Sequence, residues 1–302
     1  NNMFFGRKQE ITHADTTVRA RAKINLTLDV TGRREDGYHT VEMVMQSIAL
    51  HDTVRVTTIH GEKKPRGIVL SCSLPFLPTD ERNLAYRAAE LFYKETGALL
   101  ETCEIHIEKR IPVAAGLAGG STDAAAVLRA LNALHTAGLT DDELCEMGLK
   151  LGADVPFCLA GGCARCQGIG EKMTPVTPWH GLPLVIVRPE VSVSTGAAYA
   201  QIDAAPHKRP DTTEQMMQAL KEKDISLLSA SLINHFEESL FTLEDELACT
   251  AAALSRFGRP FQMTGSGSAF FLIADNPKEA SHIAETISRE HPAWYTAVTE
   301  TR

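Results

Sequence analysis

A stretch of strictly alternating residues near the start of the chain constrains its fold most. The apolar positions of this stretch are Val18, Ala20, Ala22, Ile24, Leu26, Leu28 and Val30, and the residues between them are polar. Alternation with a period of two predicts a β-strand with one buried face. Lys23 and Asn25 lie two residues apart and should therefore project side by side from its polar face.

Composition predicts a globular protein with a sizeable core. The chain has 302 residues, of which 44% are hydrophobic and 23% are charged, and this balance excludes a disordered chain, a collagen and a coiled coil. The length fits one large domain or two of medium size. Prolines gather at 174–183, and we place a domain boundary there, between an N-terminal domain at 1–173 and a C-terminal domain at 174–302.

Charge and hydropathy exclude several classes of partner. The formal net charge is -8, so no global field attracts nucleic acid or anionic lipid. No apolar run approaches the roughly 20 residues that span a bilayer, and the N-terminal stretch lacks the apolar core of a signal peptide. We therefore expect a cytoplasmic protein without nucleic-acid or membrane partners. A monomer or weak homodimer is the expected oligomeric state.

The cysteines predict free thiols. Seven cysteines are spread along the chain, an odd number that fits a reducing compartment better than a disulfide framework. Cys163 and Cys166 form a CxxC pair, with Cys158 upstream. Because no second ligand pair follows and no helix opens at this pair, metal or redox chemistry is the weaker interpretation.

The remaining pattern predicts a mixed α+β fold. A turn at 32–39 separates the first strand from shorter strands at 41–50, 54–58 and 103–107, and helices are expected at 84–95, after residue 118 and after the capping box at 140–143. The second half predicts elements in an order that resembles a ferredoxin-like split βαβ. These elements are a strand at 184–188, helices between 212 and 256, strands at 261–264 and 269–274, a helix from 277 and a strand at 294–298.

The segment from Gly116 to Asp123 carries the strongest chemical signal. A glycine-rich turn that opens a helix offers unpaired N–H groups and the positive end of the helix dipole, which together bind phosphate. The segment lacks the GK[ST] ending of a Walker A loop, and Ala118 breaks a G-x-G-x-x-G pattern. A tight turn packed against a sheet is the alternative interpretation.

Two further segments support a phosphate site. Gly265-Ser266-Gly267-Ser268 lies between two predicted strands, where Ser266 and Ser268 could donate to a phosphate, although a plain hairpin turn is the alternative. Asp154 stands two residues before Pro156, a favoured residue in a first helical turn. Its carboxylate either faces a ligand or merely caps that helix.

Four segments, in this order and spacing, resemble the signature set of the GHMP kinases. They are AKINLTLDVTGRREDGYHTVE at 22–42, PVAAGLAGGSTDAAA at 112–126, LGADVPFCLAGG at 151–162 and MTGSGSAFF at 263–271. Within that superfamily, AKINL followed by DGYH is similar to the branch that phosphorylates 4-diphosphocytidyl-2-C-methyl-D-erythritol. The resemblance implies an N-terminal domain like the second domain of ribosomal protein S5 and a ferredoxin-like C-terminal domain.

The same resemblance implies the reaction and the residues that serve it. The γ-phosphoryl group of ATP, with Mg²⁺, would pass to the 2-hydroxyl of the cytidine-diphosphate-linked methylerythritol in the non-mevalonate isoprenoid pathway. Lys23 and Asp154 match the catalytic pair, and Ser121 or Thr122 is the candidate metal ligand. The ATP loop falls on Pro112, Val113, Ala114, Ala115, Gly116, Leu117, Ala118, Gly119, Gly120, Ser121 and Thr122. The substrate positions are Asn25, Tyr38, His39, Thr195, Tyr199, Gly265, Ser266 and Gly267.

The chain departs from the family pattern at several positions. Alanine replaces the commoner glycine at 114, 115 and 118, and we expect a slightly altered loop because alanine resists a positive φ. Thr122 and Asp123 stand where Ser and Asn are usual, and Asp123 would be unfavourable beside a phosphate. Ser194-Thr195-Gly196 stands where the family has Ser-Thr-Pro, close to the proposed aromatic partner Tyr199.

Three other functions compete with this interpretation. The same chemistry on another alcohol, such as homoserine or mevalonate, is disfavoured by DGYH at 36–39. A silent nucleotide-binding regulator would need the glycine loop but neither Lys23 nor Asp154. A serine hydrolase is disfavoured because no G-x-S-x-G elbow surrounds Ser121, Ser266 or Ser268.

Overall fold

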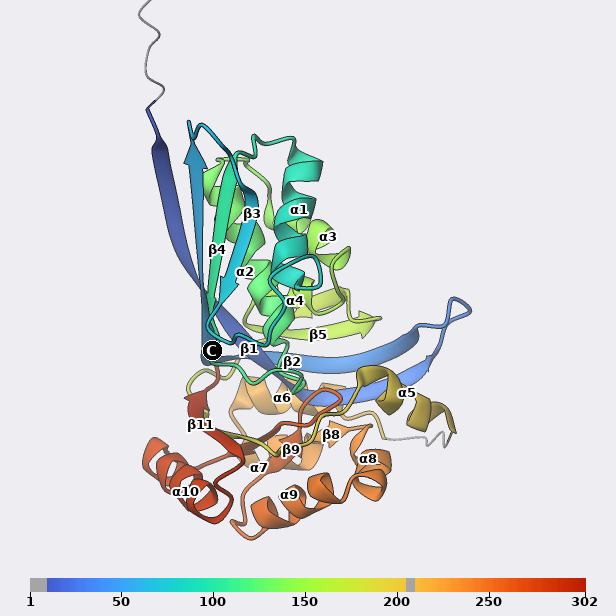
Figure 1. Ribbon diagram of the computed structural model, residues 1–302. Coiled ribbons are helices and arrows are strands. Elements are labelled where there is room, and N and C mark those ends of the chain that lie inside the picture. Colours follow the sequence, from blue (N-terminus) through green and yellow to red (C-terminus); the bar gives the residue numbers. More distant parts are fainter. Residues whose placement is uncertain (1–9, 205–209) are drawn as a thin grey trace, which may run out of the picture.

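Two β-sheets, each with its own helices, make up the protein (Figure 1). The structure is a computed structural model that describes residues 10–204 and 210–302. The larger sheet has the strand order β3-β4-β2-β1-β8, with β5 on β2 and β6 on β5, and the smaller sheet has the order β11-β7-β10-β9. The α+β class predicted from the sequence is confirmed.

A long antiparallel hairpin forms the centre of the larger sheet. It consists of β1 (Thr12–Arg33) and β2 (His39–His60), joined by the predicted turn. The separate strands expected at 41–50 and 54–58 are one strand, because the polar residues 51–53 also pair with β1. Of the other strands of the sheet, β4 (Thr102–Glu108) was predicted. The strands that were not predicted are β3 (Gly67–Cys72), β5 (Cys163–Gly168), β6 (Lys172–Pro175) and β8 (Ile233–Asn234).

Helices from the first half of the chain pack against this sheet (Figure 1). They are α1 (Leu84–Thr96), α2 (Gly119–Leu134), α3 (Asp141–Leu149) and α4 (Val155–Ala160). Helix α1 ends at Gly97 with a left-handed φ of 67°, and α3 begins with the predicted capping box of Thr140 and Glu143. Phe92 and Ile105 belong to the core between these helices and the sheet.

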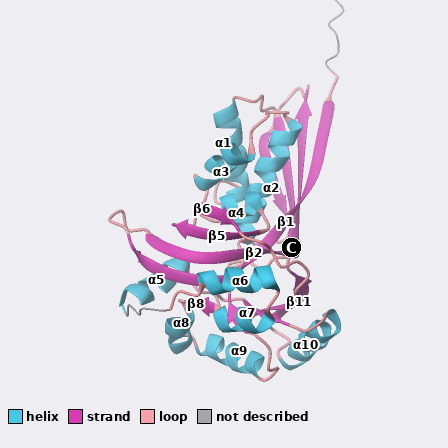
Figure 2. Cartoon of the chain, turned by 180° about the vertical axis from the view of Figure 1, so that it is seen from behind, coloured by secondary structure: helices cyan, strands magenta, loops and turns pink. Residues whose placement is uncertain are grey.

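The smaller sheet has the topology of a ferredoxin-like split βαβ, as predicted. Its strands are β7 (Pro183–Arg188), β9 (Phe261–Met263), β10 (Phe270–Ile273) and β11 (Tyr295–Glu300), and all neighbours are antiparallel. The helices of this half are α5 (Thr195–Ala204), α6 (Thr213–Glu222), α7 (Ile225–Ser231), α8 (Glu237–Leu243), α9 (Asp245–Ser255) and α10 (Pro277–Glu290). Figure 2 shows them from behind.

The two sheets share a hydrophobic core, and this corrects one prediction. Ile24 of β1 lies in one cluster with Ile186 of β7, Phe271 of β10 and residues of α6. The strand at 18–30 was expected to have one buried face, but both faces of residues 22–28 are buried. Its polar face is covered because the turn between β9 and β10 lies against it, as the contacts of Asn25 below show.

Reactive cysteines, a metal site and a membrane-spanning helix are three other features that the described residues could contain. All seven cysteines are free, as predicted, and burial raises the pKa of Cys163 and Cys166 to about 12, opposite to what a redox thiol needs. Among the described residues, no three His, Cys, Asp or Glu side chains form a group that could hold a metal ion. Within the same ranges, no helix is both long and apolar enough to cross a membrane.

Candidate active site

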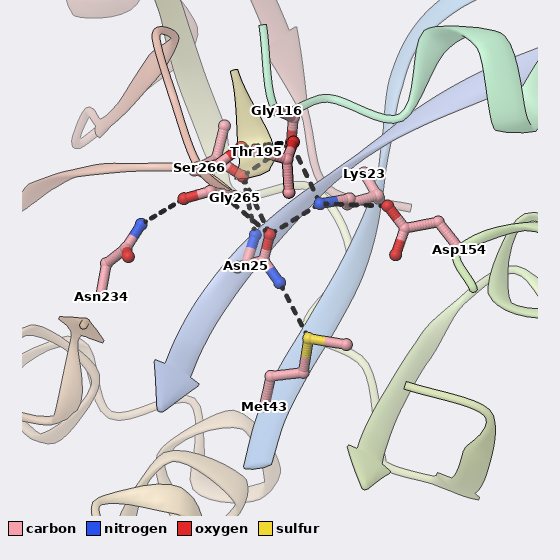
Figure 3. Close-up of polar contacts among 10 residues, drawn as sticks. Lys23, Asn25, Met43, Gly116, Asp154, Thr195, Asn234, Gly265 and Ser266 are labelled. Atoms are coloured by element: carbon pink, nitrogen blue, oxygen red, sulfur yellow. Dashed lines mark hydrogen bonds and ion pairs between the residues drawn. The ribbon is translucent and has the colours of Figure 1, made fainter. Parts of the chain in front are cut away.

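Lys23 is a buried ammonium group on β1 whose contacts join three segments of the chain (Figure 3). Only 4% of the residue is exposed. Its Nζ donates to Asn25 Oδ1 at 2.7 Å and to the carbonyl of Gly116 at 3.0 Å, and it lies 3.8 Å from Asp154 Oδ2. An ammonium has three donors, so two hold Lys23 in place while the charge faces the carboxylate.

Asn25 connects the same strand to the turn between β9 and β10. Its Oδ1 accepts from the backbone N–H of Gly265 at 3.0 Å as well as from Lys23, and its Nδ2 donates to Met43 Sδ at 3.4 Å. The backbone N–H of Asn25 donates to Thr264 Oγ1 at 3.0 Å. Residue 25 is 1% exposed, so these contacts compensate for the burial of a polar side chain.

Asp154 lies directly before α4, and its carboxylate is available for chemistry. Its side chain is 35% exposed, and in the described structure it makes no hydrogen bond that caps the helix. The interpretation of Asp154 as a simple helix cap is therefore wrong. The local reason is that its ψ of -15° is already helical, whereas a side-chain cap usually requires an extended residue.

The glycine-rich segment forms a loop that ends where α2 begins. Gly116 has a φ of 79°, and a Cβ there would lie 2.1 Å from the carbonyl oxygen of Thr264, so only glycine fits. Ala114 and Ala118 also have positive φ values, 52° and 59°. Alanine therefore adopts the strained left-handed conformation at these two positions. A slightly altered loop stays a prediction.

The Gly265-Ser266-Gly267-Ser268 segment is both a hairpin turn and part of the site. It joins β9 to β10, and the carbonyl of Gly265 accepts from Asn234 Nδ2 at 2.9 Å (Figure 3). Ser266 Oγ lies 3.0 Å from Thr195 Oγ1 at the start of α5. Ser268 was expected to face a phosphate, but it is fully buried and donates to the carbonyl of Val191.

An aromatic group stands at the turn between β1 and β2. The His39 and Tyr199 rings are stacked, with centroids 4.3 Å apart and an angle of 17° between them. Burial raises the pKa of Tyr199 to about 12, so this ring is a neutral phenol. Tyr38 is 61% exposed beside them. The altered sequence at 194–196 therefore does not prevent Tyr199 from reaching this position.

One cavity of about 810 Å³ is bordered by the catalytic pair, the glycine-rich loop, the turn between β9 and β10 and the aromatic group. Its lining includes the predicted residues Lys23, Asn25, Tyr38, His39, Ala114, Ala115, Gly116, Ala118, Gly119, Gly120, Ser121, Asp154, Thr195, Tyr199, Gly265, Ser266 and Gly267. Predicted residues outside this lining are Pro112, Val113, Leu117 and Thr122. Thr122 is 2% exposed, which leaves Ser121 as the hydroxyl that borders the cavity.

Asp123 does not face the cavity, contrary to what its place in the motif suggested. Its Oδ2 accepts from Lys109 Nζ at 2.8 Å, and Lys109 also pairs with Asp52. Burial raises the pKa of Asp123, although its partner Lys109 acts in the opposite direction. The same pairing makes Lys109 unavailable to an anionic substrate.

Several lining residues escaped prediction from the sequence. They are mainly apolar side chains, such as Val193 and Phe236, that come from segments distant in the chain. Phe236 packs edge-on against Tyr199, with ring centroids 5.0 Å apart. No motif marks Val193 or Phe236, because any apolar side chain of suitable size serves as a wall.

Comparisons with known proteins agree with this geometry. The family model described as the GHMP kinase N-terminal domain matches residues 83–162, and the GHMP kinase C-terminal model matches residues 216–293. A 4-diphosphocytidyl-2-C-methyl-D-erythritol kinase of Clostridium botulinum (strain Alaska E43 / Type E3) is 42% identical over 281 residues, which cover 91% of this chain and 96% of that protein. A protein of the same name from Clostridium tetani (strain Massachusetts / E88) is 45% identical over 258 residues, 84% of this chain and 89% of that one.

Solved structures support both the kinase family and the fold. A crystal structure of 4-(cytidine 5'-diphospho)-2C-methyl-D-erythritol kinase is 34% identical, with a TM-score of 0.78, and the match covers 95% of this chain and all of that one. A homoserine kinase from Cytophaga hutchinsonii matches with a TM-score of 0.74 over 100% and 97% of the two chains, but at 18% identity it shows the fold alone. The chain therefore belongs to the GHMP kinases, and within them to the 4-diphosphocytidyl-2-C-methyl-D-erythritol kinase family.

Proposed function

We propose that this chain is a kinase that transfers the γ-phosphoryl group of ATP to the 2-hydroxyl of 4-diphosphocytidyl-2-C-methyl-D-erythritol. The products would be the 2-phosphate and ADP, in the non-mevalonate route to isoprenoids. The observation that carries the proposal is the Lys23–Asp154 pair, 3.8 Å apart, in the same cavity as the glycine-rich loop. The names of relatives that match 84% and 91% of the chain support this acceptor.

Asp154 and Lys23 have separate roles in this reaction. Phosphoryl transfer passes through a loose transition state, so positioning and charge neutralisation matter more than a strong base. Asp154 would accept the hydroxyl proton late, at Oδ1, the oxygen that is not paired with Lys23. Lys23 orients the carboxylate and offers positive charge to the group in transfer.

The loop and the start of α2 would bind the phosphates of ATP. The first backbone N–H groups of a helix have no partner within the helix, and its dipole is positive at that end. Gly119 and Gly120, which open α2, line the cavity and bring this backbone close to a ligand.

The residues present also fit Mg²⁺, which would neutralise charge on the phosphates when bound. Magnesium keeps several waters and takes few protein ligands, so a single hydroxyl suffices. Ser121 provides that hydroxyl because it borders the cavity, whereas Thr122 is buried away from it.

The aromatic group would hold the cytosine of the acceptor. Tyr38 offers an exposed ring for stacking, and His39 and Tyr199 form a second wall. Thr195 and Ser266, hydrogen-bonded to each other, would contact the substrate between this group and the catalytic pair, with Asn25, Gly265 and Gly267.

The proposal also includes the domain boundary, the oligomeric state, the compartment and the partners expected from the sequence. We place the domain boundary at 173/174, although β6 lies across it and pairs with β5. A monomer or weak homodimer in the cytoplasm, without nucleic-acid partners, stays a prediction.

The test is ADP release from the purified protein with Mg-ATP and three acceptors in parallel: diphosphocytidyl methylerythritol, homoserine and mevalonate. We expect turnover with the cytidylyl compound only. Turnover with another alcohol would support the proposed kinase activity but contradict the proposed acceptor. ATP binding without turnover of any acceptor would instead favour a nucleotide-binding regulator.

A further inference from the structure

Asp203, near the end of α5, holds both strands of the β1–β2 hairpin at the point where they end. Its Oδ1 lies 2.8 Å from His39 Nε2, and its Oδ2 accepts from Arg33 Nη1 at 3.0 Å. Arg33 and His39 are paired across the hairpin in the strand register, next to the turn that carries Tyr38. One carboxylate therefore connects α5 to the last residue pair of the hairpin.

The same face of α5 fixes the His39 ring in a second way. Tyr199 lies one helical turn before Asp203 and stacks on the imidazole, while Phe236 supports the Tyr199 ring from another direction. The His39 side chain is only 10% exposed, in contrast to its neighbour Tyr38. The imidazole is thus held on one face by stacking and at Nε2 by the carboxylate.

We propose that Asp203 is a positioning residue for the pocket that binds the pyrimidine base of the nucleoside diphosphate. The inference rests on the proposed function and adds to it a residue that no sequence motif marks. A carboxylate partner fixes both the orientation and the tautomer of an imidazole, and so prepares the other ring nitrogen for a ligand. By holding Arg33 as well, Asp203 also fixes the backbone on either side of the turn.

A merely stabilising ion pair would behave differently. The Asp203 side chain is 35% exposed, and exposed ion pairs contribute little to folding. The hydrogen bond from His39 lowers the pKa of Asp203, so the carboxylate accepts that bond as an anion at neutral pH. The loss of this carboxylate should therefore weaken binding of the base while the folded state keeps its stability.

The experiment compares Asp203→Asn with the unaltered chain and with a matched control. Asp15→Asn serves as the control, since Asp15 also pairs with an arginine of the hairpin, Arg55, at 3.2 Å, but neither residue lines the cavity, whereas His39, the partner of Asp203, does. The readouts are the Kd of cytidine 5'-diphosphate by calorimetry, the KM of each substrate, kcat and the thermal midpoint. We expect the Kd and the KM of the cytidylyl substrate to rise roughly three- to tenfold in Asp203→Asn. The KM of ATP, kcat and the midpoint should stay unchanged.

A second variant tests whether Asp203 acts through His39. In a His39→Asn background, the further change Asp203→Asn should raise the Kd of cytidine 5'-diphosphate by less than the single change does. Asp203→Glu keeps the carboxylate, so its Kd for cytidine 5'-diphosphate should lie between that of the unaltered chain and that of Asp203→Asn.

Three outcomes would overturn the proposal. They are an unchanged Kd in Asp203→Asn, an equal rise in the KM of ATP, and a failure of the unaltered chain to bind cytidine 5'-diphosphate. Failure of the proposed function is a separate result, because it would appear as binding of this nucleotide by the unaltered chain without turnover.

Discussion

The two ends of the cavity are built in different ways. At the catalytic end, Lys23 and Asn25 are almost completely buried and bond to backbone groups of Gly116 and Gly265. At the end near the hairpin turn, Tyr38 is 61% exposed, and the contacts that fix His39 come from side chains. The catalytic end is part of the core, whereas the other end carries an exposed ring, Tyr38, and is fixed by side-chain contacts.

Stability and function are coupled at the buried end of the cavity and separable at the exposed end. A buried polar group that loses its partner costs about 1 to 3 kcal/mol, more if it is charged, so changes among the buried residues should affect both folding and turnover. Changes at the exposed end should affect affinity alone, because water replaces the lost contacts there. The predictions below test this division.

The largest effect is expected for Asp154→Asn. An amide cannot accept the hydroxyl proton, and loss of a general base typically costs 10²- to 10⁴-fold, so we expect kcat to fall about a thousandfold. The Kd of ATP and the free energy of unfolding should change little, because the side chain is 35% exposed. Single-turnover kinetics measure the rate of phosphoryl transfer, and calorimetry measures the Kd of ATP and the unfolding. Near-normal turnover would remove Asp154 from its role.

Asn25→Ala should reduce both stability and activity. It removes the oxygen that accepts from Lys23 and from the backbone of Gly265, so it leaves a buried ammonium and a buried N–H with fewer partners. We expect a loss of about 2 to 4 kcal/mol in the free energy of unfolding, measured in urea, together with a lower kcat. Asn25→Asp retains an acceptor and is the matched control, with a smaller loss of stability. Equal stability of Asn25→Ala and the unaltered chain would contradict the view that the buried residues of the site affect folding as well as turnover.

Tyr38→Ala should affect only the acceptor. A stacked base contributes about 1 to 3 kcal/mol, so the KM of the cytidylyl substrate should rise about tenfold or more. The exposed ring packs against little, and we expect the unfolding midpoint and the KM of ATP to stay as they are. A rise in the KM of ATP instead would place the base pocket elsewhere.

The sequence predicted the parts of this molecule that local rules control. The capping box at 140–143 and the glycine-rich turn before α2 follow from residues a few positions apart. The continuity of β2 did not follow, because the polar residues at 51–53 interrupt the apolar pattern while their backbone still pairs with β1.

The same limit applies to the site. Family motifs indicated Lys23, Asp154 and His39, but Phe236 reaches the cavity wall, and Asp203 reaches His39, only through the tertiary fold. Asp123 was misplaced for a related reason. The place of Asp123 in the motif suggested that it lies near a phosphate. Instead, the Asp123 side chain points into the core, where it bonds to Lys109 on the segment after β4.

The smallest effect is expected in the loop, where the chain departs from its family. Ala118 has a φ of 59°, a conformation that costs a residue with a Cβ about 1 to 2 kcal/mol, and glycine avoids that cost. Glycine also adds freedom to the unfolded chain, worth about 0.4 to 1 kcal/mol, so Ala118→Gly should stabilise the protein by only about 0.5 to 1 kcal/mol. Ala115→Gly is the matched control, because Ala115 is buried without a positive φ and its replacement should destabilise the protein. Urea unfolding of the two variants decides the sign, and a loss of stability in Ala118→Gly would mean that the methyl group packs well enough to offset its strain.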